Sequence, residues 1–282
     1  MIKLLALSAI LFSSWCFAQV REIAITLDDL PLVASKMNTP ENQLLARKRF
    51  NNIVQAFTKY QVPVTGFVIA GAIEQGQWAF LEQFRQAGFL LGNHTYSHYN
   101  LNQTNANEYI ADIDRADKIL APILTEPKYF RYPYLAEGDV ATNQKVCAYL
   151  NAHHYIVAPV TIDSRDYDFN AFLYKIPIPL RETSVSALKL FYLNHIWQQT
   201  LQAEKRAVEE GQGTRQILLL HANLFNSYVL EDVLEMYKRK GYKFISLTEA
   251  LKNPAPPITV PTAEEKKTMK FTNTPSFCNF YP

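Results

Sequence analysis

The sequence predicts an α/β fold in which parallel strands alternate with helices, arranged as a barrel or as a doubly wound sheet. Short apolar runs recur along the chain without polar alternation, as in ITL, VIA and ILLL. Strands buried on both faces have this character, which is typical of a parallel sheet covered by helices. Amphipathic stretches of helical length separate the runs. With 282 residues, of which 48% are hydrophobic, the chain can form one large domain or two small ones.

These patterns assign most of the chain to strands and helices. Strands are predicted at Ile23–Leu27, Val62–Ile69, Phe89–Leu91, Tyr129–Arg131, Tyr155–Ile162, Gln216–Leu220 and Lys243–Leu247. Helices are predicted at Glu41–Tyr60, Trp78–Gln86, Asn107–Leu120, Val140–Leu150, Thr183–Glu210 and Tyr228–Lys240. The interval between Ile162 and Gln216 is unusually long. We expect an ordinary long outer helix there, and the alternative is a lid or groove wall over a functional site.

Residues 1–18 resemble an export signal. A positive residue precedes the short apolar run Leu4–Phe12, and Ala18 is a small residue suited to cleavage. The apolar run is shorter than the roughly 20 residues that span a bilayer. Lipid attachment at Cys16 is the alternative, but the bulky Trp15 before it does not suit such a site. We therefore expect cleavage after Ala18, a periplasmic or secreted protein, and no integral membrane segment once the signal is removed.

The rest of the chain is predicted to form one domain with a tail. We expect the catalytic domain over residues 19–252 and a C-terminal tail packed on it over residues 253–282, because the Pro-rich stretch Asn253–Pro257 ends regular structure. Export permits a disulfide between Cys147 and Cys278, which would hold down the tail. Two unpaired buried thiols are the alternative, since the pairing cannot be deduced from the sequence.

The charge balance argues against two classes of partner. The chain has 28 basic and 26 acidic residues, a net charge of +2 at pH 7, and no long basic run. Proteins that bind nucleic acid or an anionic membrane surface usually concentrate positive charge in one patch. We therefore expect neither partner.

Polar clusters directly follow five of the predicted strands. Asp28 and Asp29 come after Ile23–Leu27, and burying two unpaired carboxylates in a core would be costly. One such pair alone would indicate a solvated turn. Because the carboxyl ends of parallel strands share one face, five clusters indicate an active site on that face. The other four clusters are Asn93–His98, Arg131–Tyr134, Asp163–Asp168 and His221.

Three histidines in these clusters are candidates for chemistry. His94 and His98 are four residues apart, which in an extended strand separates them by about 13 Å, too far to share an ion. If the chain becomes helical at His94, their Cβ atoms lie about 5–6 Å apart and both can bind one metal ion, with Thr95 and Ser97 holding the turn. Two surface histidines are the alternative. His221 follows a buried run and needs a partner or a task.

In the order and content of these clusters, the sequence resembles the polysaccharide deacetylase family, carbohydrate esterase family four. The resemblance extends from about Ile23 to Leu251 and implies a distorted (β/α) barrel with about seven strands and an active site at their carboxyl ends. The histidine motif is the most specific. In family order, the motifs are Thr26-Leu27-Asp28-Asp29, His94-Thr95-Tyr96-Ser97-His98, Arg131-Tyr132-Pro133-Tyr134, Asp163-Ser164-Arg165-Asp166-Tyr167 and Leu219-Leu220-His221.

The resemblance implies a metal-dependent hydrolase that removes acetyl groups from an N- or O-acetylated carbohydrate. Asp29, His94 and His98 would bind one divalent metal ion and leave positions open for water and the acetyl oxygen. Two imidazoles and a carboxylate suit Zn²⁺, and Co²⁺, Ni²⁺ or Mn²⁺ could replace it.

The resemblance also implies the catalytic roles. Asp28 would take a proton from the attacking water, and Arg131 would keep Asp28 ionised and oriented. His221 would protonate the departing amine or alkoxide. Asp166 would hold His221 charged and oriented.

Three further residues would face the substrate. The backbone N–H of Tyr134 would stabilise the oxyanion, and Leu219 would line the acetyl pocket. Tyr167 stands where the family has an aromatic residue, often Trp. Two features depart from the family pattern and bear on the substrate more than on the reaction. Ala222-Asn223 follow the fifth motif where Asp is frequent, and the segment 167–215 has no counterpart in a compact member.

Peptidoglycan, a chitin-like oligomer, xylan and an exopolysaccharide are all open as substrates. A non-catalytic carbohydrate-binding homologue is one alternative, but such a protein would be expected to lose its base or its acid, and Asp28 and His221 are both present. An amidase acting on a small non-carbohydrate amide is another, because it would use the same metal ligands.

Overall fold

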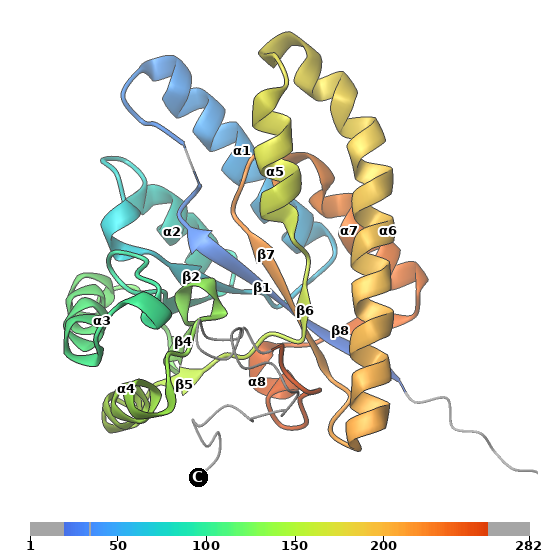
Figure 1. Ribbon diagram of the computed structural model, residues 1–282. Helices are drawn as coiled ribbons and strands as arrows, with labels where there is room; N and C mark the ends of the chain where they lie inside the picture. The colour runs from blue at the N-terminus through green and yellow to red at the C-terminus, as the bar shows by residue number, and fades with distance from the viewer. Residues whose placement is uncertain (1–19, 34, 259–282) are drawn as a thin grey trace, which may run out of the picture.

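The computed structural model describes residues 20–33 and 35–258, and one parallel sheet organises them (Figure 1). Its strands are β1 (Arg21–Leu30), β2 (Thr65–Val68), β3 (Leu90–Asn93), β4 (Tyr129–Phe130), β5 (Ile156–Val157), β6 (Ile162–Asp163), β7 (Gln216–His221) and β8 (Tyr242–Phe244). The strand order is β5-β4-β3-β2-β1-β7-β6, and β8 pairs with the start of β1. The sheet is curled into an open half-barrel, which confirms the predicted distorted (β/α) barrel.

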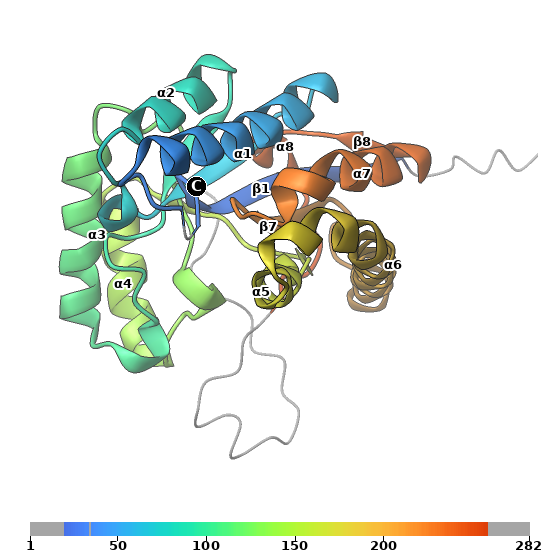
Figure 2. The same ribbon diagram turned by 90° about the horizontal axis from the view of Figure 1, so that it is seen from above.

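Helices connect the strands and surround the outside of the half-barrel, as the view from above shows (Figure 2). They are α1 (Pro40–Lys59), α2 (Trp78–Gln86), α3 (Ala106–Leu120), α4 (Val140–Ala152), α5 (Asp166–Lys175), α6 (Ile178–Glu210), α7 (Asn226–Arg239) and α8 (Leu247–Ala250). Short 3₁₀ helices lie at Ala70–Ala72, Leu101–Gln103 and Pro133–Leu135. None of the helices in the described part of the chain combines the length and hydrophobicity needed to cross a bilayer.

Strand β1 shows how the sheet separates its two faces. Every second residue is fully buried in the main core beneath the helices, namely Ile23, Ile25 and Leu27. Ala24 belongs instead to a second apolar cluster that includes Phe67 and fills the inside of the half-barrel. Because side chains alternate along a strand, Thr26 and Asp28 also face inward. The inside of the half-barrel is therefore apolar near the start of β1 and polar at its carboxyl end.

The single strand predicted at Tyr155–Ile162 is wrong, because the structure forms the two short strands β5 and β6 with Pro159 between them. Proline has no N–H group to donate to a neighbouring strand. β5 pairs with β4, whereas β6 pairs with β7 at the opposite edge of the sheet. The chain between β5 and β6 therefore crosses the opening of the half-barrel.

The strand predicted at Lys243–Leu247 is wrong in its second half. β8 ends at Phe244, and helix α8 begins at Leu247. The Ser246 hydroxyl accepts a hydrogen bond from the Glu249 N–H at 3.1 Å. This N-terminal cap starts a helix where the apolar pattern alone indicated a strand.

The long interval before β7 forms two helices rather than the one predicted from Thr183. α5 was not anticipated, and Pro177 separates it from the 33-residue helix α6. α6 packs as a long outer helix through one buried side, made of Val185, Tyr192, Ile196, Thr200, Ala203 and Ala207. α5 begins at Asp166, so it is α5 that carries residues of the fourth motif.

The described start of the predicted tail packs on the domain. The Ala255 N–H donates to the Arg215 carbonyl at 2.9 Å, and the Ile258 N–H donates to the Val160 carbonyl at 2.7 Å. The predicted signal peptide and Cys278 lie outside the described residues. Cys147 is buried in α4 and disulfide-bonded, and its pairing with Cys278 stays a prediction.

Candidate active site

Two adjacent carboxylates meet at the carboxyl end of β1 because the backbone leaves the regular strand there. Asp28 is 2% exposed and faces the inside of the half-barrel. Asp29 has a φ of 62°, a left-handed conformation that Asp adopts more readily than most residues. In a regular strand Asp29 would point to the opposite face. The turn, with the irregular β1–β2 register between Leu27 and Leu30, instead leaves both carboxylates within 4 Å of His94 Nε2, at 3.8 and 3.5 Å.

The histidine motif does not form the predicted helical turn. Thr95 and His98 have φ values of 65° and 56°, so the chain turns through left-handed residues. Asn93 Oδ1 accepts a hydrogen bond from the Thr95 N–H at 2.7 Å, and Thr95 Oγ1 accepts one from the His98 N–H at 3.0 Å. The rings of His94 and His98 nevertheless lie 4.9 Å apart between centroids. The two imidazoles therefore lie close together as expected, but the backbone conformation that brings them together is not the expected helical turn.

Asp112 holds the same turn from α3, and no motif pointed to it. Its Oδ2 accepts hydrogen bonds from the N–H groups of Tyr96 at 3.0 Å and Ser97 at 2.8 Å. Asp112 is 7% exposed and lies beside the fully buried Ile113. An acidic residue on the buried side of a helix is the sequence signal that could have revealed this role.

Asp29, His94 and His98 each present one ligand atom to a common point, and these atoms lie within 4.8 Å of one another. Asp29 Oδ1 is 3.5 Å from His94 Nε2 and 3.3 Å from His98 Nε2. This buried oxygen has no hydrogen-bond partner among the described residues, a state that costs free energy unless a cation or donor satisfies it. Two imidazole nitrogens and a carboxylate oxygen suit a divalent transition metal, so the residues fit such an ion.

The surroundings favour the forms of these side chains that bind metal. His94 Nδ1 lies 2.8 Å from the Arg131 carbonyl oxygen, which only accepts hydrogen bonds. The neutral imidazole therefore carries its hydrogen on Nδ1 and presents the lone pair of Nε2 towards Asp29. Burial alone would raise the pKa of Asp29. Without a metal ion, protonated His94 and His98, and then the charge of His221, outweigh burial and hold that pKa well below its usual value.

Arg131 contacts Asp28 inside the half-barrel, as the sequence predicted. Its Nη1 lies 3.3 and 3.4 Å from the two carboxylate oxygens, and the side chains are 1% and 3% exposed. Nη2 donates to Thr26 Oγ1 at 3.2 Å, and Nε donates to the Ala158 carbonyl at 2.6 Å. A planar guanidinium held by this many acceptors fixes the orientation of the carboxylate beside it.

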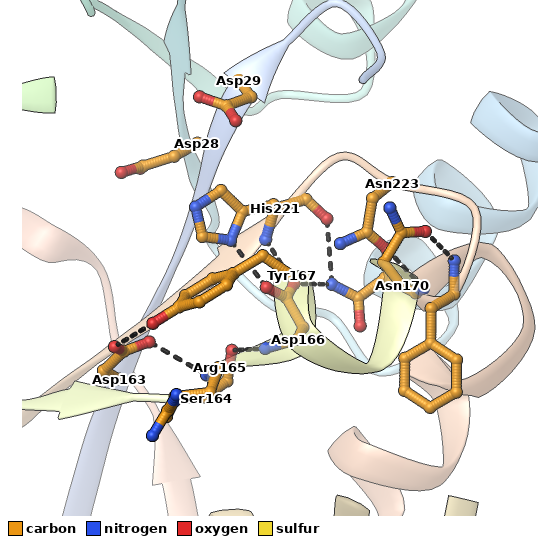
Figure 3. A network of polar contacts seen from close by, with 12 residues as sticks. Asp28, Asp29, Asp163, Ser164, Arg165, Asp166, Tyr167, Asn170, His221 and Asn223 are labelled. Atoms are coloured by element: carbon orange, nitrogen blue, oxygen red, sulfur yellow. Dashed lines mark hydrogen bonds and ion pairs between the residues drawn. The ribbon is translucent and has the colours of Figure 1, made fainter. Parts of the chain in front are cut away.

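His221 and Asp166 form the second predicted pair, drawn in Figure 3. His221 ends β7 opposite Asp28 in the β1–β7 register. Its Nδ1 is 2.6 Å from Asp166 Oδ1, and its backbone N–H donates to Asp166 Oδ2 at 2.7 Å. Burial lowers the pKa of His221, but the charge of the fully buried Asp166, and then those of Asp29 and Asp28, outweigh burial and raise that pKa to about 10. The imidazolium is therefore stable at neutral pH.

Asn226, at the start of α7, fixes this pair and lies outside the motifs. Its fully buried amide donates to Asp166 Oδ2 and to the His221 carbonyl, the latter at 2.9 Å. Asn226 Oδ1 accepts a hydrogen bond from the Tyr192 hydroxyl at 3.4 Å. Asn223, one of the two residues that depart from the family pattern, accepts a hydrogen bond at Oδ1 from the N–H of Asn226, the first residue of α7, at 2.8 Å. The Asn-x-x-Asn spacing after a buried strand is the signal for this arrangement.

The three residues predicted to face the substrate surround the same site. The Tyr134 ring lies 4.6 Å from the His98 ring, and Tyr134 is 58% exposed. The Tyr167 ring meets the His221 ring edge-on at 5.6 Å. Leu219 is 4% exposed and lies two residues before His221, on the same face of β7.

Comparison with known proteins gives a consistent result. Residues 18–157 match the family model of polysaccharide deacetylase. A chitin deacetylase from Arthroderma benhamiae is 36% identical over 90 residues, which cover 31% of this chain and 23% of that protein. A peptidoglycan-N-acetylglucosamine deacetylase from Bacillus cereus is 27% identical over 147 residues, covering 52% and 46%. The chain thus spans less than half the length of these two curated relatives.

Solved structures share the fold. A peptidoglycan deacetylase from Bacillus subtilis superposes with a TM-score of 0.55 at 19% identity, covering 89% of this chain and 96% of that one. A CE4 family pseudoenzyme from Bacillus anthracis gives a TM-score of 0.57 at 15% identity, covering 82% and 65%. At these identities the likeness concerns the fold alone. Because the region matched by the family model contains the first three motifs in their expected order, and the fold agrees, this chain belongs to the polysaccharide deacetylase family.

Proposed function

We propose that this protein is a metal-dependent hydrolase that removes acetyl groups from an N- or O-acetylated carbohydrate. The observation that carries the proposal is the placement of Asp28 and His221 at paired positions of β1 and β7, beside the cluster of Asp29, His94 and His98. A base and an acid next to a metal site are what hydrolysis of an amide or ester requires. Relatives named as deacetylases of chitin and of peptidoglycan support the substrate class.

Asp29, His94 and His98 are the proposed ligands of one divalent ion. Zn²⁺ suits this set best, and Co²⁺, Ni²⁺ or Mn²⁺ are substitutes. When bound, such an ion supplies Lewis-acid chemistry, in which an acyl carbonyl is polarised and the ionisation of water is favoured.

The chain's own residues move the protons. Asp28, oriented by Arg131, accepts a proton from the water that attacks the acetyl carbon. As the bond from this carbon to the sugar nitrogen or oxygen breaks, His221 donates its Nε2 proton to the departing atom. Asp166 binds Nδ1 of the same ring, so the proton available for transfer is on the nitrogen that faces the site.

Substrate contacts follow from the residues around this centre. The Tyr134 N–H donates to the oxyanion, Leu219 lines the acetyl pocket, and Tyr167 packs beside the sugar. We further propose that residues 1–18 direct export, that residues 19–252 form the catalytic domain, and that the protein acts in the periplasm or outside the cell. The export signal lies outside the described residues.

Acetate release tests the proposal, with peptidoglycan, chitin oligomers, acetylated xylan and a bacterial exopolysaccharide as substrates. Release from any of these supports a carbohydrate deacetylase. Glycan binding without release from any of them would favour a non-catalytic homologue. Release only from small non-carbohydrate amides would favour an amidase.

We predict that His98→Ala abolishes metal binding. Loss of one of three ligands leaves too few donors, so bound zinc should fall from about one ion per chain to nearly none, measured by elemental analysis after dialysis. His153→Ala, at the end of α4, is the control and should keep its zinc. Full zinc occupancy in a His94→Ala/His98→Ala double variant would show that the ligands are wrong.

Substitution of the two adjacent carboxylates should impair different properties of the protein, the rate of hydrolysis for Asp28 and zinc binding for Asp29. Asp28→Asn should retain zinc but release acetate about 10²–10⁴-fold more slowly, because an amide cannot accept the proton of water. Asp29→Asn should lose zinc itself, measured by the same elemental analysis. Near-normal acetate release by Asp28→Asn would mean that another residue is the base.

The role of His221 as the acid can be tested by the pH dependence of kcat/KM. His221 acts while protonated, so activity falls as pH rises through its pKa, which Asp166 raises. Asp166→Asn removes that negative charge, and the alkaline limb should move to lower pH. His221→Ala should lose about 10²–10⁴-fold in rate with zinc retained.

Asp163→Asn is the matched control for this shift. The Asp163 carboxylate accepts hydrogen bonds from the Arg165 N–H at 2.9 Å and the Tyr167 hydroxyl at 3.1 Å. Its removal should therefore move the alkaline limb less. An unchanged limb in Asp166→Asn, or an equal shift in Asp163→Asn, would contradict the assignment of Asp166.

A further inference from the structure

A second hollow lies apart from the acid and base, between the connection that leaves β1, the first turns of α1 and the end of α5. It has a volume of ≈ 200 Å³, and its described lining residues are Ser35, Lys36, Asn42, Leu45, Arg49 and Tyr174. Figure 1 shows the start of α1 and the end of α5 on the side of the molecule towards which the β1 arrow points. The elements that line the hollow therefore lie towards the carboxyl end of β1, where the active-site residues are.

Positive charge dominates this hollow. Lys36 is exposed and Arg49 is half-buried, and neither forms an ion pair with another residue of the described ranges. The Arg49 Nη1 contacts the buried Ser35 hydroxyl at 3.5 Å, which directs the guanidinium into the hollow. Among the described lining residues there is no Asp or Glu. Two unpaired cations on one small concave surface attract an anion more strongly than the same charges on a flat surface.

The walls add features that suit a ligand with a polar and an apolar side. The Tyr174 hydroxyl is buried and has no hydrogen-bond partner among the described residues. The Arg181 guanidinium lies 5.0 Å from the centroid of the Tyr174 ring and brings a third cation close to the hollow. Leu45 supplies apolar surface, and Asn42 adds a polar side chain.

The chain connects this hollow to the proposed acid. α5 begins with Asp166 and Tyr167, and Tyr174 follows seven residues later, about 10 Å along the helix axis. The Val33 N–H, on the connection that leads to Ser35, donates to the Ala222 carbonyl at 2.7 Å. α5 therefore bears both Tyr167, whose ring meets the ring of His221, and Tyr174, which lines the hollow.

We propose that this hollow binds an anionic substituent of the glycan, a carboxylate on a nearby sugar, so that the enzyme prefers acidic acetylated glycans to neutral ones. The inference rests on the proposed deacetylase function and adds the class of substrate. Guanidinium and ammonium groups bind carboxylates through charge-assisted hydrogen bonds. A free anion such as phosphate has the same chemistry, and the experiment separates the two sources.

The test compares two oligosaccharides of equal length. One is a neutral chitin oligomer, and the other alternates N-acetylglucosamine with a uronic acid. Dissociation constants and kcat/KM are measured for the full chain and for Lys36→Gln/Arg49→Gln. The control is Arg47→Gln/Lys48→Gln, which removes the same two charges from exposed positions of α1. Inorganic phosphate is titrated as a competitor.

We expect the wild type to favour the acidic oligosaccharide. The pocket variant loses both cations that can bind the carboxylate, so it should reduce this preference about tenfold or more. The control variant should keep the wild-type preference. Phosphate should compete with the acidic oligosaccharide and not with the neutral one. Equal preference in the pocket and control variants, or phosphate binding that leaves both oligosaccharides unaffected, would overturn the inference.

The binding arm keeps this result separate from the deacetylase proposal. Pocket-dependent binding of the acidic oligosaccharide, with no acetate release from it or from any of the four polysaccharide substrates named above, would support the hollow as an anion site and contradict the proposed function. Acetate release from both oligosaccharides, with no dependence on Lys36 and Arg49, would support the function and contradict the hollow.

Discussion

One buried guanidinium connects the parts of the molecule on which the candidate site depends. Arg131 extends from the end of β4 to Asp28 and Thr26 on β1, and it also donates to the carbonyl of Ala158, where the chain crosses the opening of the half-barrel. Its own carbonyl oxygen lies against Nδ1 of His94. Because Arg131 is 1% exposed, removing its side chain would leave a buried carboxylate unpaired, at a cost of about 3–5 kcal/mol. The proposed base and a proposed ligand therefore share one support.

The proposed acid and the proposed base of this site need opposite protonation states, and the structure gives each a partner of opposite charge. Asp28 lies against Arg131, whereas His221 lies against the fully buried Asp166, which raises the pKa of His221 to about 10. An acid and a base can act at the same pH only if the pKa values of the two groups differ, and charged neighbours create that difference. Asn226 then links Asp166 to the backbone of His221, so the proposed acid is positioned by β7, α5 and α7 together.

The sequence predicted the features that depend on contiguous residues, such as the buried strands and the polar residues at their ends. β1 and β7 are buried on both faces, so their apolar runs are continuous, and the polar residues that end them mark the site. β5 and β6 could not be predicted as two strands, because each has two residues and its pairing is decided by partners at opposite edges of the sheet. The roles of Asp112 and Asn226 could not be predicted, because these residues bind backbone groups that only the folded chain brings near them. The turn at Thr95 could not be predicted for the same reason, because Asp112 on α3 holds the N–H groups of Tyr96 and Ser97 in that turn.

We propose that one divalent ion, held by Asp29, His94 and His98 beside Asp28 and His221, is required for hydrolysis. The most direct measurement is acetate release during stepwise addition of zinc to protein freed of metal with a chelator, using the polysaccharide that is hydrolysed fastest. We predict almost no release without zinc and a linear rise that reaches its maximum at about one equivalent per chain, as one site requires. Full release by the metal-free protein, or a rate that does not change as zinc is added, would contradict the claim.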